Sequence, residues 1–203
     1  MTFENINRTS DAKSKDNGVS IVIPTWNGFK ILEKFLPTVV KAKLAFEQSY
    51  GWLVEIIITD DASDDNTGEW LGSNYPDITF VTSSERLGFS GNSNRGIQAA
   101  QYRLVYLLNN DVAITAETLP PLVKHFDDTN VFAAASQVYD FETGILAGAG
   151  QIGEFRRGFL RVHDRYFVPP DAPENAGPYL TIYATGGSAM YDRDKFLEIG
   201  GFD

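Results

Sequence analysis

Residues 103–111 of the chain, RLVYLLNND, pass from a run of apolar side chains straight into two asparagines and an aspartate. The apolar part is short and does not alternate with polar residues, so it predicts a strand that is buried on both faces of a sheet. In open α/β sheets, ligands bind in the crevice beyond the carboxyl ends of the strands. We therefore expect Asn109, Asn110 and Asp111 to stand at the edge of a binding site.

The flanking sequence predicts further strands that alternate with helices. Short apolar runs indicate strands at residues 19–24, 54–59, 78–81 and 131–138. Apolar residues at helical spacing indicate a helix over residues 29–50, which Pro37 should kink or break. Glycine-rich residues 85–97 should lead into a helix at 98–100, and further helices are expected around residues 70–71, 118–126 and 193–199. This alternation predicts a mostly parallel sheet with right-handed crossovers.

Periodicity fails between residues 139 and 178, where glycine, proline, aromatic residues and arginines dominate. This composition indicates a hairpin followed by a flexible loop, such as a cover for an active site. The arginines from Arg156 to Arg165 are open to two interpretations, a solvated hairpin face or a phosphate clamp.

The length, charge and cysteine content of the chain limit the class of protein to which it can belong. A chain of 203 residues fits one domain with a substantial core, which we assign to residues 19–203 after a polar, flexible segment at residues 1–18. With 27 acidic against 17 basic residues the net charge is −10, which excludes a general nucleic-acid binder because such a protein needs a basic face. The chain has no cysteine, so it contains neither a disulfide framework nor a thiolate metal site.

No apolar run reaches the ~20 residues that cross a bilayer. Together with the absence of cysteine, this favours a cytoplasmic location. A peripheral contact with the inner face of a membrane stays open as an alternative.

Three of the predicted strands end in polar residues, and the ends of parallel strands share one edge of a sheet. Thr25 and Asn27 follow the first strand, Asp60 and Asp61 the second, and residues 109–111 the one quoted above. A nucleoside diphosphate needs acceptors for its base and ribose and a hard cation for its phosphates. The carboxylate of Asp60 can accept a hydrogen bond from the base or the ribose. Asp111 suits Mg²⁺ or Mn²⁺, which take one or two protein carboxylates together with phosphate oxygens.

Simpler interpretations stay open for each of these residues. Asp60, Asp111 and the two asparagines, taken singly, fit turn chemistry, and Asp64 and Asp65 fit helix caps or solvated charges. Gly186-Gly187 fits a close packing point. His125 and His163 lack the spacing of metal ligands, so we interpret them as structural or surface residues.

Several segments, in order, resemble the family 2 glycosyltransferases. Residues 19–28 are similar to the opening strand of that family, and residues 57–67 to its Asp-Asp-x-Ser-x-Asp segment. Residues 87–96 resemble the Gly-Phe-(Ala/Ser)-x-x-x-Asn segment of its rhamnosyltransferase-like members. Residues 185–190 and 199–203 resemble its acceptor-side segment.

The resemblance implies a GT-A fold, an α/β Rossmann-like three-layer sandwich with a mostly parallel mixed sheet. It also implies transfer of a hexosyl or deoxyhexosyl group, with inversion and metal assistance, from a UDP-, dTDP- or GDP-linked sugar. The acceptor would be a hydroxyl of a saccharide or lipid-linked molecule in the synthesis of cell-surface polysaccharide or glycoconjugate.

Matched by position, the resemblance implies roles for individual residues. The metal, Mg²⁺ or Mn²⁺, would bind Asp111, and Asn109 stands where the family has the first aspartate of its Asp-x-Asp element, so the site carries less charge. Gly186, Gly187 and Ser188 would lie on the acceptor side. The donor-binding residues would be Pro24, Thr25, Asn27, Asp60, Asp61, Gly88, Asn94, Asn109 and Asn110.

The chain departs from the family after its Gly-Gly-Phe-Asp motif, since it ends at Asp203, before the Glu-Asp segment that holds the usual general base. Asp203 is the nearest candidate for that base by sequence. A second hypothesis is therefore a nucleotide-sugar binding module without catalysis. A third, a nucleotidyltransferase, would need a glycine-rich basic loop after the first strand, which residues 24–28 do not provide.

Overall fold

The computed structural model describes residues 17–148, 150–166 and 180–203. Of the predicted flexible segment at residues 1–18, the first 16 residues lie outside the described residues. Gly18, at its end, already belongs to a strand. The part of the predicted covering loop at residues 167–178 also lies outside them.

A six-stranded sheet forms the centre of the molecule, in the order β3-β2-β1-β4-β10-β5. Strands β1 to β4 run parallel, and β10 is antiparallel to both of its neighbours. The predicted mostly parallel mixed sheet is thus confirmed. The bounds are β1 Gly18–Thr25, β2 Leu53–Asp60, β3 Thr79–Thr82, β4 Leu104–Leu108, β5 Ala133–Ala135 and β10 Ser188–Asp192.

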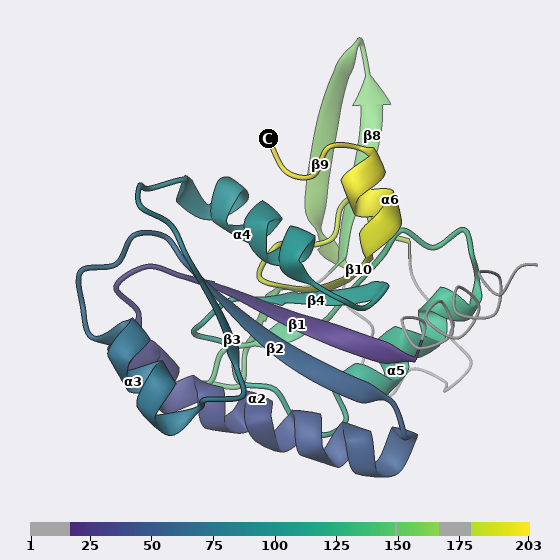
Figure 1. Cartoon of the computed structure of the whole chain (residues 1–203). Helices are drawn as coiled ribbons and strands as arrows, with labels where there is room; N and C mark the ends of the chain where they lie inside the picture. Colours follow the sequence, from purple (N-terminus) through teal and green to yellow (C-terminus); the bar gives the residue numbers. More distant parts are fainter. Residues whose placement is uncertain (1–16, 149, 167–179) are drawn as a thin grey trace, which may run out of the picture.

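Helices cover both faces of this sheet and complete the predicted three layers (Figure 1). On one face lie α2 (Phe29–Tyr50), α3 (Thr67–Asn74) and α5 (Leu119–Lys124), which continues into the 3₁₀ turn η1 (His125–Asp127). On the other face lie α4 (Gly88–Ala99) and α6 (Arg193–Glu198).

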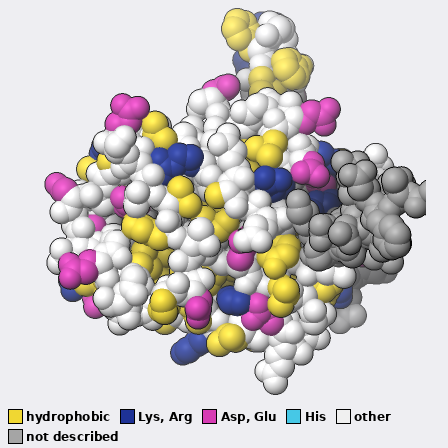
Figure 2. Space-filling view, viewed as in Figure 1, with side chains coloured by type: hydrophobic (Ala, Val, Ile, Leu, Met, Phe, Trp, Pro, Cys, Tyr) yellow, Lys and Arg dark blue, Asp and Glu magenta, His cyan; other side chains and the backbone are white. Residues whose placement is uncertain are grey.

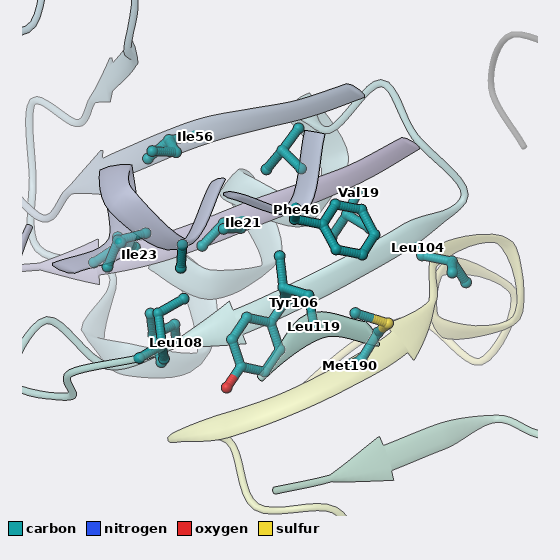
Figure 3. Close-up of a cluster of buried hydrophobic side chains, with 14 of the residues drawn as sticks. Val19, Ile21, Ile23, Phe46, Ile56, Leu104, Tyr106, Leu108, Leu119 and Met190 are labelled. Atoms are coloured by element: carbon teal, nitrogen blue, oxygen red, sulfur yellow. The ribbon is translucent and has the colours of Figure 1, made fainter. Parts of the chain in front are cut away.

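Alternate side chains of the buried strands pack into two separate hydrophobic cores, one on each face of the sheet. Ile21 of β1 and Tyr106 of β4 point to the side of α2, where Phe46 packs beside them (Figure 3). Val22 and Leu107, one residue along each strand, point to the side of α4 and α6. This alternation explains why the strands are apolar throughout, because both of their faces are buried.

Helix α2 continues through Pro37, so of the predicted kink or break the break does not occur. Proline inside a helix costs ~3 kcal/mol or more because it removes a hydrogen bond and crowds the preceding turn. The helix buries a stripe that outweighs this cost: Leu32, Leu36, Val39, Ala42 and Phe46.

Helix α4 begins at Gly88, so most of the segment expected to precede a helix is itself helical. Gly96 within this helix reflects close packing on the sheet. A Cβ added at Gly96 would lie 2.3 Å from Cγ1 of Val22 on β1. The helix therefore crosses the sheet at a distance that only glycine permits at this position.

The predicted strand at residues 131–138 is wrong in extent, because it divides into β5 and the short strand β6 (Val138–Tyr139). The neighbour of β5 in the sheet, β10, starts at Ser188, whose carbonyl accepts from the N–H of Ser136. Beyond this bond the chain leaves the sheet, and β6 pairs with β7 (Leu146–Gly148). The predicted hairpin is confirmed as β8 (Gly150–Arg156) and β9 (Phe159–Tyr166).

Candidate functional site

The strand order reverses at β1, and this reversal opens a crevice at its carboxyl end. From β1 the chain proceeds through α2 to β2 and β3 on one side, and then crosses by α4 on the opposite face to β4 on the other side. A topological switch point of this kind is where open α/β sheets bind ligands. The side-chain amide of Asn110 donates to the hydroxyl of Thr25 across it, at 2.9 Å.

A cleft of about 320 Å³ lies at this point. Its size falls at the lower end of the ~300–1,000 Å³ range of small-molecule sites. It is lined by Pro24, Thr25, Trp26, Ile31, Asp61, Arg86, Gly88, Phe89, Asn92, Asn109, Asn110 and Asp111. The structure thus brings most of the expected donor-binding residues and the expected metal ligand to one cleft, whereas Asn27, Asp60 and Asn94 are not among its lining residues.

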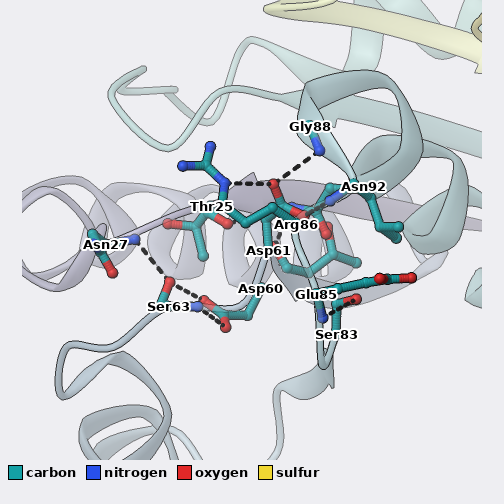
Figure 4. A network of polar contacts seen from close by, with 12 residues as sticks. Thr25, Asn27, Asp60, Asp61, Ser63, Ser83, Glu85, Arg86, Gly88 and Asn92 are labelled. Carbon is teal, nitrogen blue, oxygen red and sulfur yellow. Dashed lines mark hydrogen bonds and ion pairs between the residues drawn. The ribbon is translucent and has the colours of Figure 1, made fainter.

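Asp60 and Asn27 are used to hold two loops together behind the cleft (Figure 4). Both carboxylate oxygens of Asp60 accept from Ser63, one from its hydroxyl and one from its N–H at 2.9 Å. The same hydroxyl accepts from the N–H of Asn27 at 2.7 Å, and the Asn27 amide oxygen accepts from the N–H of Asp64 at 3.0 Å. These bonds fix the turn after β1 against the loop after β2.

Asp61 anchors the start of α4 at the edge of the cleft. Its carboxylate accepts from the N–H groups of Leu87 and Gly88, at 2.6 and 3.0 Å, and lies 3.6 Å from Nε of Arg86. An anion is stabilised at a helix N-terminus because the helix dipole and the free N–H groups both favour negative charge there. Asp61 is 3% exposed, so this anchor is buried under the cleft wall.

Asn94, the other expected donor residue outside the cleft, holds the C-terminal segment. Its amide donates to the carbonyl of Phe202 at 2.8 Å, and its oxygen accepts from the N–H of the same residue at 3.0 Å. Asp203, the candidate base, follows directly and is exposed.

Trp26 and Arg86 form a wall of the cleft that sequence reasoning missed. The guanidinium of Arg86 stacks over the Trp26 ring at 3.5 Å from its centroid, while its Nε faces Asp61. Trp26 is 48% exposed despite its size. An aromatic residue in the polar turn after the first strand was the available signal, but the contact joins residues 60 positions apart, which no local pattern reveals.

Asn92, also missed, lies at the floor of the cleft. Its amide donates to the carbonyls of Thr25 and Thr59, the last or next-to-last residues of β1 and β2, at 3.3 and 2.8 Å. Among the residues that the structure describes, its amide oxygen has no hydrogen-bond partner, although Asn92 is only 2% exposed. An unsatisfied buried acceptor at a cleft floor is suited to a ligand donor or a bound water.

The acceptor-side residues divide between the cleft wall and the core. A Cβ added at Gly186 would lie 3.1 Å from Phe89, and one at Gly187 would lie 3.1 Å from the Asn109 amide, so both glycines pack against lining residues. Ser188 is buried and its hydroxyl lies 2.6 Å from that of Tyr106. Burial raises the pKa of Tyr106 more than its hydrogen bonds lower it, so this phenol stays neutral.

Asp111 is exposed at the cleft and, within the described part of the chain, has no hydrogen-bond or ion-pair partner. Among the described residues, no group of three or more His, Cys, Asp or Glu side chains is placed so that it could hold a metal ion by itself. The available oxygens are therefore one free carboxylate and the amides of Asn109 and Asn110. This set fits Mg²⁺ or Mn²⁺ held largely by substrate phosphates and water, because such ions need only one or two protein carboxylates.

The chain is similar in sequence to known glycosyl transferases. The sequence profile of Glycosyl transferase family 2 matches residues 20–200. The undecaprenyl-phosphate 4-deoxy-4-formamido-L-arabinose transferase of Proteus mirabilis is 30% identical over 126 residues, which cover 60% of this chain and 34% of that protein. The chain spans between about a third and just over half of the length of the curated relatives that it matches.

Two solved structures share the fold. The mannosyltransferase PcManGT of Pyrobaculum calidifontis, in complex with GDP-Man and Mn²⁺, superposes with a TM-score of 0.61 at 20% identity, over 91% of this chain and 47% of that one. GalNAc-T7 with UDP, GalNAc and Mn²⁺ gives a TM-score of 0.68 at 19% identity, over 92% and 36%.

Proposed function

The chain belongs to Glycosyl transferase family 2, and we propose that its cleft binds a nucleoside-diphosphate sugar and presents the sugar to an acceptor hydroxyl. The observation that carries the proposal is the meeting of Thr25, Asn110 and Asp111 at the switch point of the sheet, in one cleft. A switch point supplies backbone and short polar side chains at the ends of buried strands, which is the environment that nucleotides use in this class of sheet.

The diphosphate is assigned to the side of the cleft formed by Asn109, Asn110 and Asp111. Asp111 would bind a divalent cation, with the amide of Asn109 as a neutral neighbour. The bound cation would neutralise charge on the departing diphosphate as a Lewis acid. Because only one carboxylate is free there, we expect cation and nucleotide to bind together, each weakly without the other. The presence of Mn²⁺ in both solved structures supports this role.

The nucleoside is assigned to the wall formed by Trp26, Asp61 and Arg86. The Trp26 face suits a planar base, and Arg86 would slide off it or stack on the other face of the base. Asp60 and Asn27 act in this proposal by fixing the two loops that carry the wall, since their side chains are bonded to protein. The proposed donor is a UDP-, GDP- or dTDP-linked sugar, and the thermal-shift screen below identifies the base.

The chemical step is displacement at the anomeric carbon. The acceptor oxygen forms a bond to that carbon as the bond to the diphosphate oxygen breaks, which inverts the centre. A base must take the acceptor proton from within ~3 Å. Asp203 is the nearest candidate by sequence, and the acceptor, a saccharide or a lipid-linked hydroxyl, would approach past Gly186 and Gly187. The name of the Proteus mirabilis relative supports a lipid-linked acceptor.

A thermal-shift screen of UDP, GDP and dTDP and their sugars, with and without Mn²⁺, tests the proposal. One nucleotide series should raise the melting temperature, and Mn²⁺ should increase that shift. No stabilisation by any of them would refute nucleotide binding. A donor-hydrolysis and transfer assay with the stabilising sugar then separates an enzyme from the alternative, a non-catalytic nucleotide-sugar binding module.

A further inference from the structure

The β8–β9 hairpin projects from the body of the molecule, on the same side of the sheet as α4 and α6 (Figure 1). Arg157 and Gly158 form its two-residue turn, with φ angles of 53° and 82°. Positive φ at both central residues is the mark of a type I′ turn, whose twist matches that of the two strands. The hairpin is therefore a regular structure, and among the residues that the structure describes its outer end projects away from the rest of the protein.

The outer part of the hairpin has one apolar face. Directly paired residues of antiparallel strands lie on the same face, and Phe155 pairs with Leu160 while Val162 pairs with Gly153. Phe155 is 80% exposed, and Leu160 and Val162 are each about half exposed. Within the described part of the chain, this face is covered at its base, where Ile182 packs over Gly153. At the tip, Phe159 is also exposed.

The hairpin differs in charge from the rest of the chain. Residues 150–166 contain four arginines and two acidic residues, a formal charge of +2, whereas the remaining residues carry −12 of the total of −10. Arg156, Arg157 and Arg161 are all exposed: Arg157 lies in the turn, and the other two lie on the face opposite Phe155, where Arg161 pairs with Glu154. Figure 2 shows hydrophobic and basic side chains together on the projecting tip, while acidic side chains are scattered over the body below.

We propose that the β8–β9 hairpin docks the protein on an anionic lipid surface. A hairpin with apolar side chains on one face, and arginines on the other face and in the turn, suits the boundary between headgroups and acyl chains. The apolar side chains enter the apolar layer while the guanidinium groups stay with the phosphates. The acidic body would be repelled by the same surface. A projecting basic hairpin overcomes this repulsion, because charges more than ~8–10 Å away are screened at physiological salt.

Co-sedimentation of the 203-residue protein with vesicles tests the docking without any nucleotide. We expect binding to vesicles of 70% phosphatidylcholine and 30% phosphatidylglycerol in moderate salt, and at least tenfold weaker binding to pure phosphatidylcholine. Arg156→Glu should weaken binding by about fivefold or more, since each basic side chain near such a surface contributes about that factor. Phe155→Asp should weaken it through loss of the apolar contact.

The matched controls are Lys41 and Leu44 of α2. Both side chains are exposed, and both lie outside the hairpin. Lys41→Glu makes the same charge change as Arg156→Glu, and Leu44→Asp matches Phe155→Asp, so both should bind vesicles like the parent. Equal binding by parent and hairpin variants would overturn the proposal, as would binding that ignores lipid charge. Self-association abolished by Phe155→Asp, without vesicle binding, would instead assign the hairpin to a second copy of the chain. None of these results depends on nucleotide binding.

Discussion

The side-chain amide of Asn110 donates a 2.9 Å hydrogen bond to the hydroxyl of Thr25, joining the turn after β4 to the last residue of β1. The two strands are neighbours in the sheet, although β2, β3 and three helices separate them along the chain. The bond thus closes the floor of the cleft at the point where the strand order reverses.

Gly28→Ala should damage this junction. The added Cβ would lie 2.0 Å from the Thr25 hydroxyl and 2.8 Å from the Asn110 amide, so one of the two side chains must move. We expect the free energy of unfolding to fall by about 1–3 kcal/mol, as for other overpacked sites, and nucleotide affinity to fall with it. Urea denaturation and calorimetry measure the two effects.

The control for this substitution is Gly72→Ala, because a Cβ there meets nothing within 4 Å in helix α3. Alanine is favoured over glycine inside a helix, so this variant should gain up to about 1 kcal/mol. If Gly28→Ala unfolds at the same urea concentration as the parent, the close packing at the junction is not as described.

Asp111→Ala tests the metal ligand. Removing the free carboxylate should make nucleoside-diphosphate affinity in Mn²⁺ equal to the parent's affinity without Mn²⁺. Loss of a charged contact of this kind costs about 1.5–3 kcal/mol, or about 10- to 100-fold in Kd. Asp64→Ala is the matched control, since Asp64 is exposed but does not line the cleft. An undiminished effect of Mn²⁺ on Asp111→Ala would rule Asp111 out.

Short apolar runs that end in polar residues were enough to predict the sheet and the meeting of Thr25 with residues 109–111, because parallel strands that are buried on both faces leave little choice of direction. The start of α4 could not be predicted, since glycine, serine and asparagine have low helix propensity. What makes that segment helical is distant: Asp61 binds its first N–H groups, and Gly96 packs on Val22.

Side-chain roles were harder to predict than positions in the fold. Asp60 and Asn94 stand in motif-like segments, yet their polar atoms are bonded to Ser63 and Phe202 of the protein itself. A sequence pattern gives the residue type and its place, but the partner of a buried polar group depends on which donors the fold brings near. The contact between Trp26 and Arg86 could not be predicted from the sequence either, because it too depends on which residues the fold brings together.

Trp26→Ala tests the nucleoside wall. If a base stacks on this ring, its loss should weaken nucleoside monophosphate binding by about 1–3 kcal/mol even without metal. Trp26→Phe keeps an aromatic face at the same position and should retain most of the affinity. Titration followed by calorimetry in EDTA measures both variants. Parental affinity in Trp26→Ala would show that the base lies elsewhere.

Asp65→Asn should weaken the fold in a pH-dependent manner. Helix α2 has Gly28 before its first residue, so no local side chain caps it, and the N–H of Phe29 donates instead to Asp65 Oδ2 at 3.0 Å. The other oxygen of Asp65 accepts from the N–H and the hydroxyl of Thr67, at 3.1 and 2.6 Å. One carboxylate therefore holds the starts of α2 and α3 together.

Burial raises the pKa of Asp65, but the hydrogen bonds from Thr67 and Phe29 together outweigh it and hold the pKa below its ordinary value of 3.8. A pKa that is lower in the folded than in the unfolded state means that the ionised form stabilises the fold above pH 3.8, and that this stabilisation is lost as pH falls through the folded pKa. At pH 7, Asp65→Asn should lower the free energy of unfolding by about 1 kcal/mol, as loss of a helix cap does.

The difference in the free energy of unfolding between variant and parent should shrink below pH 3.8. Urea denaturation from pH 7 to pH 2.5 measures it, with Asp64→Asn expected within about 0.5 kcal/mol of the parent throughout. A difference that stays constant down to pH 2.5 would mean that the Asp65 charge does not stabilise these helix starts.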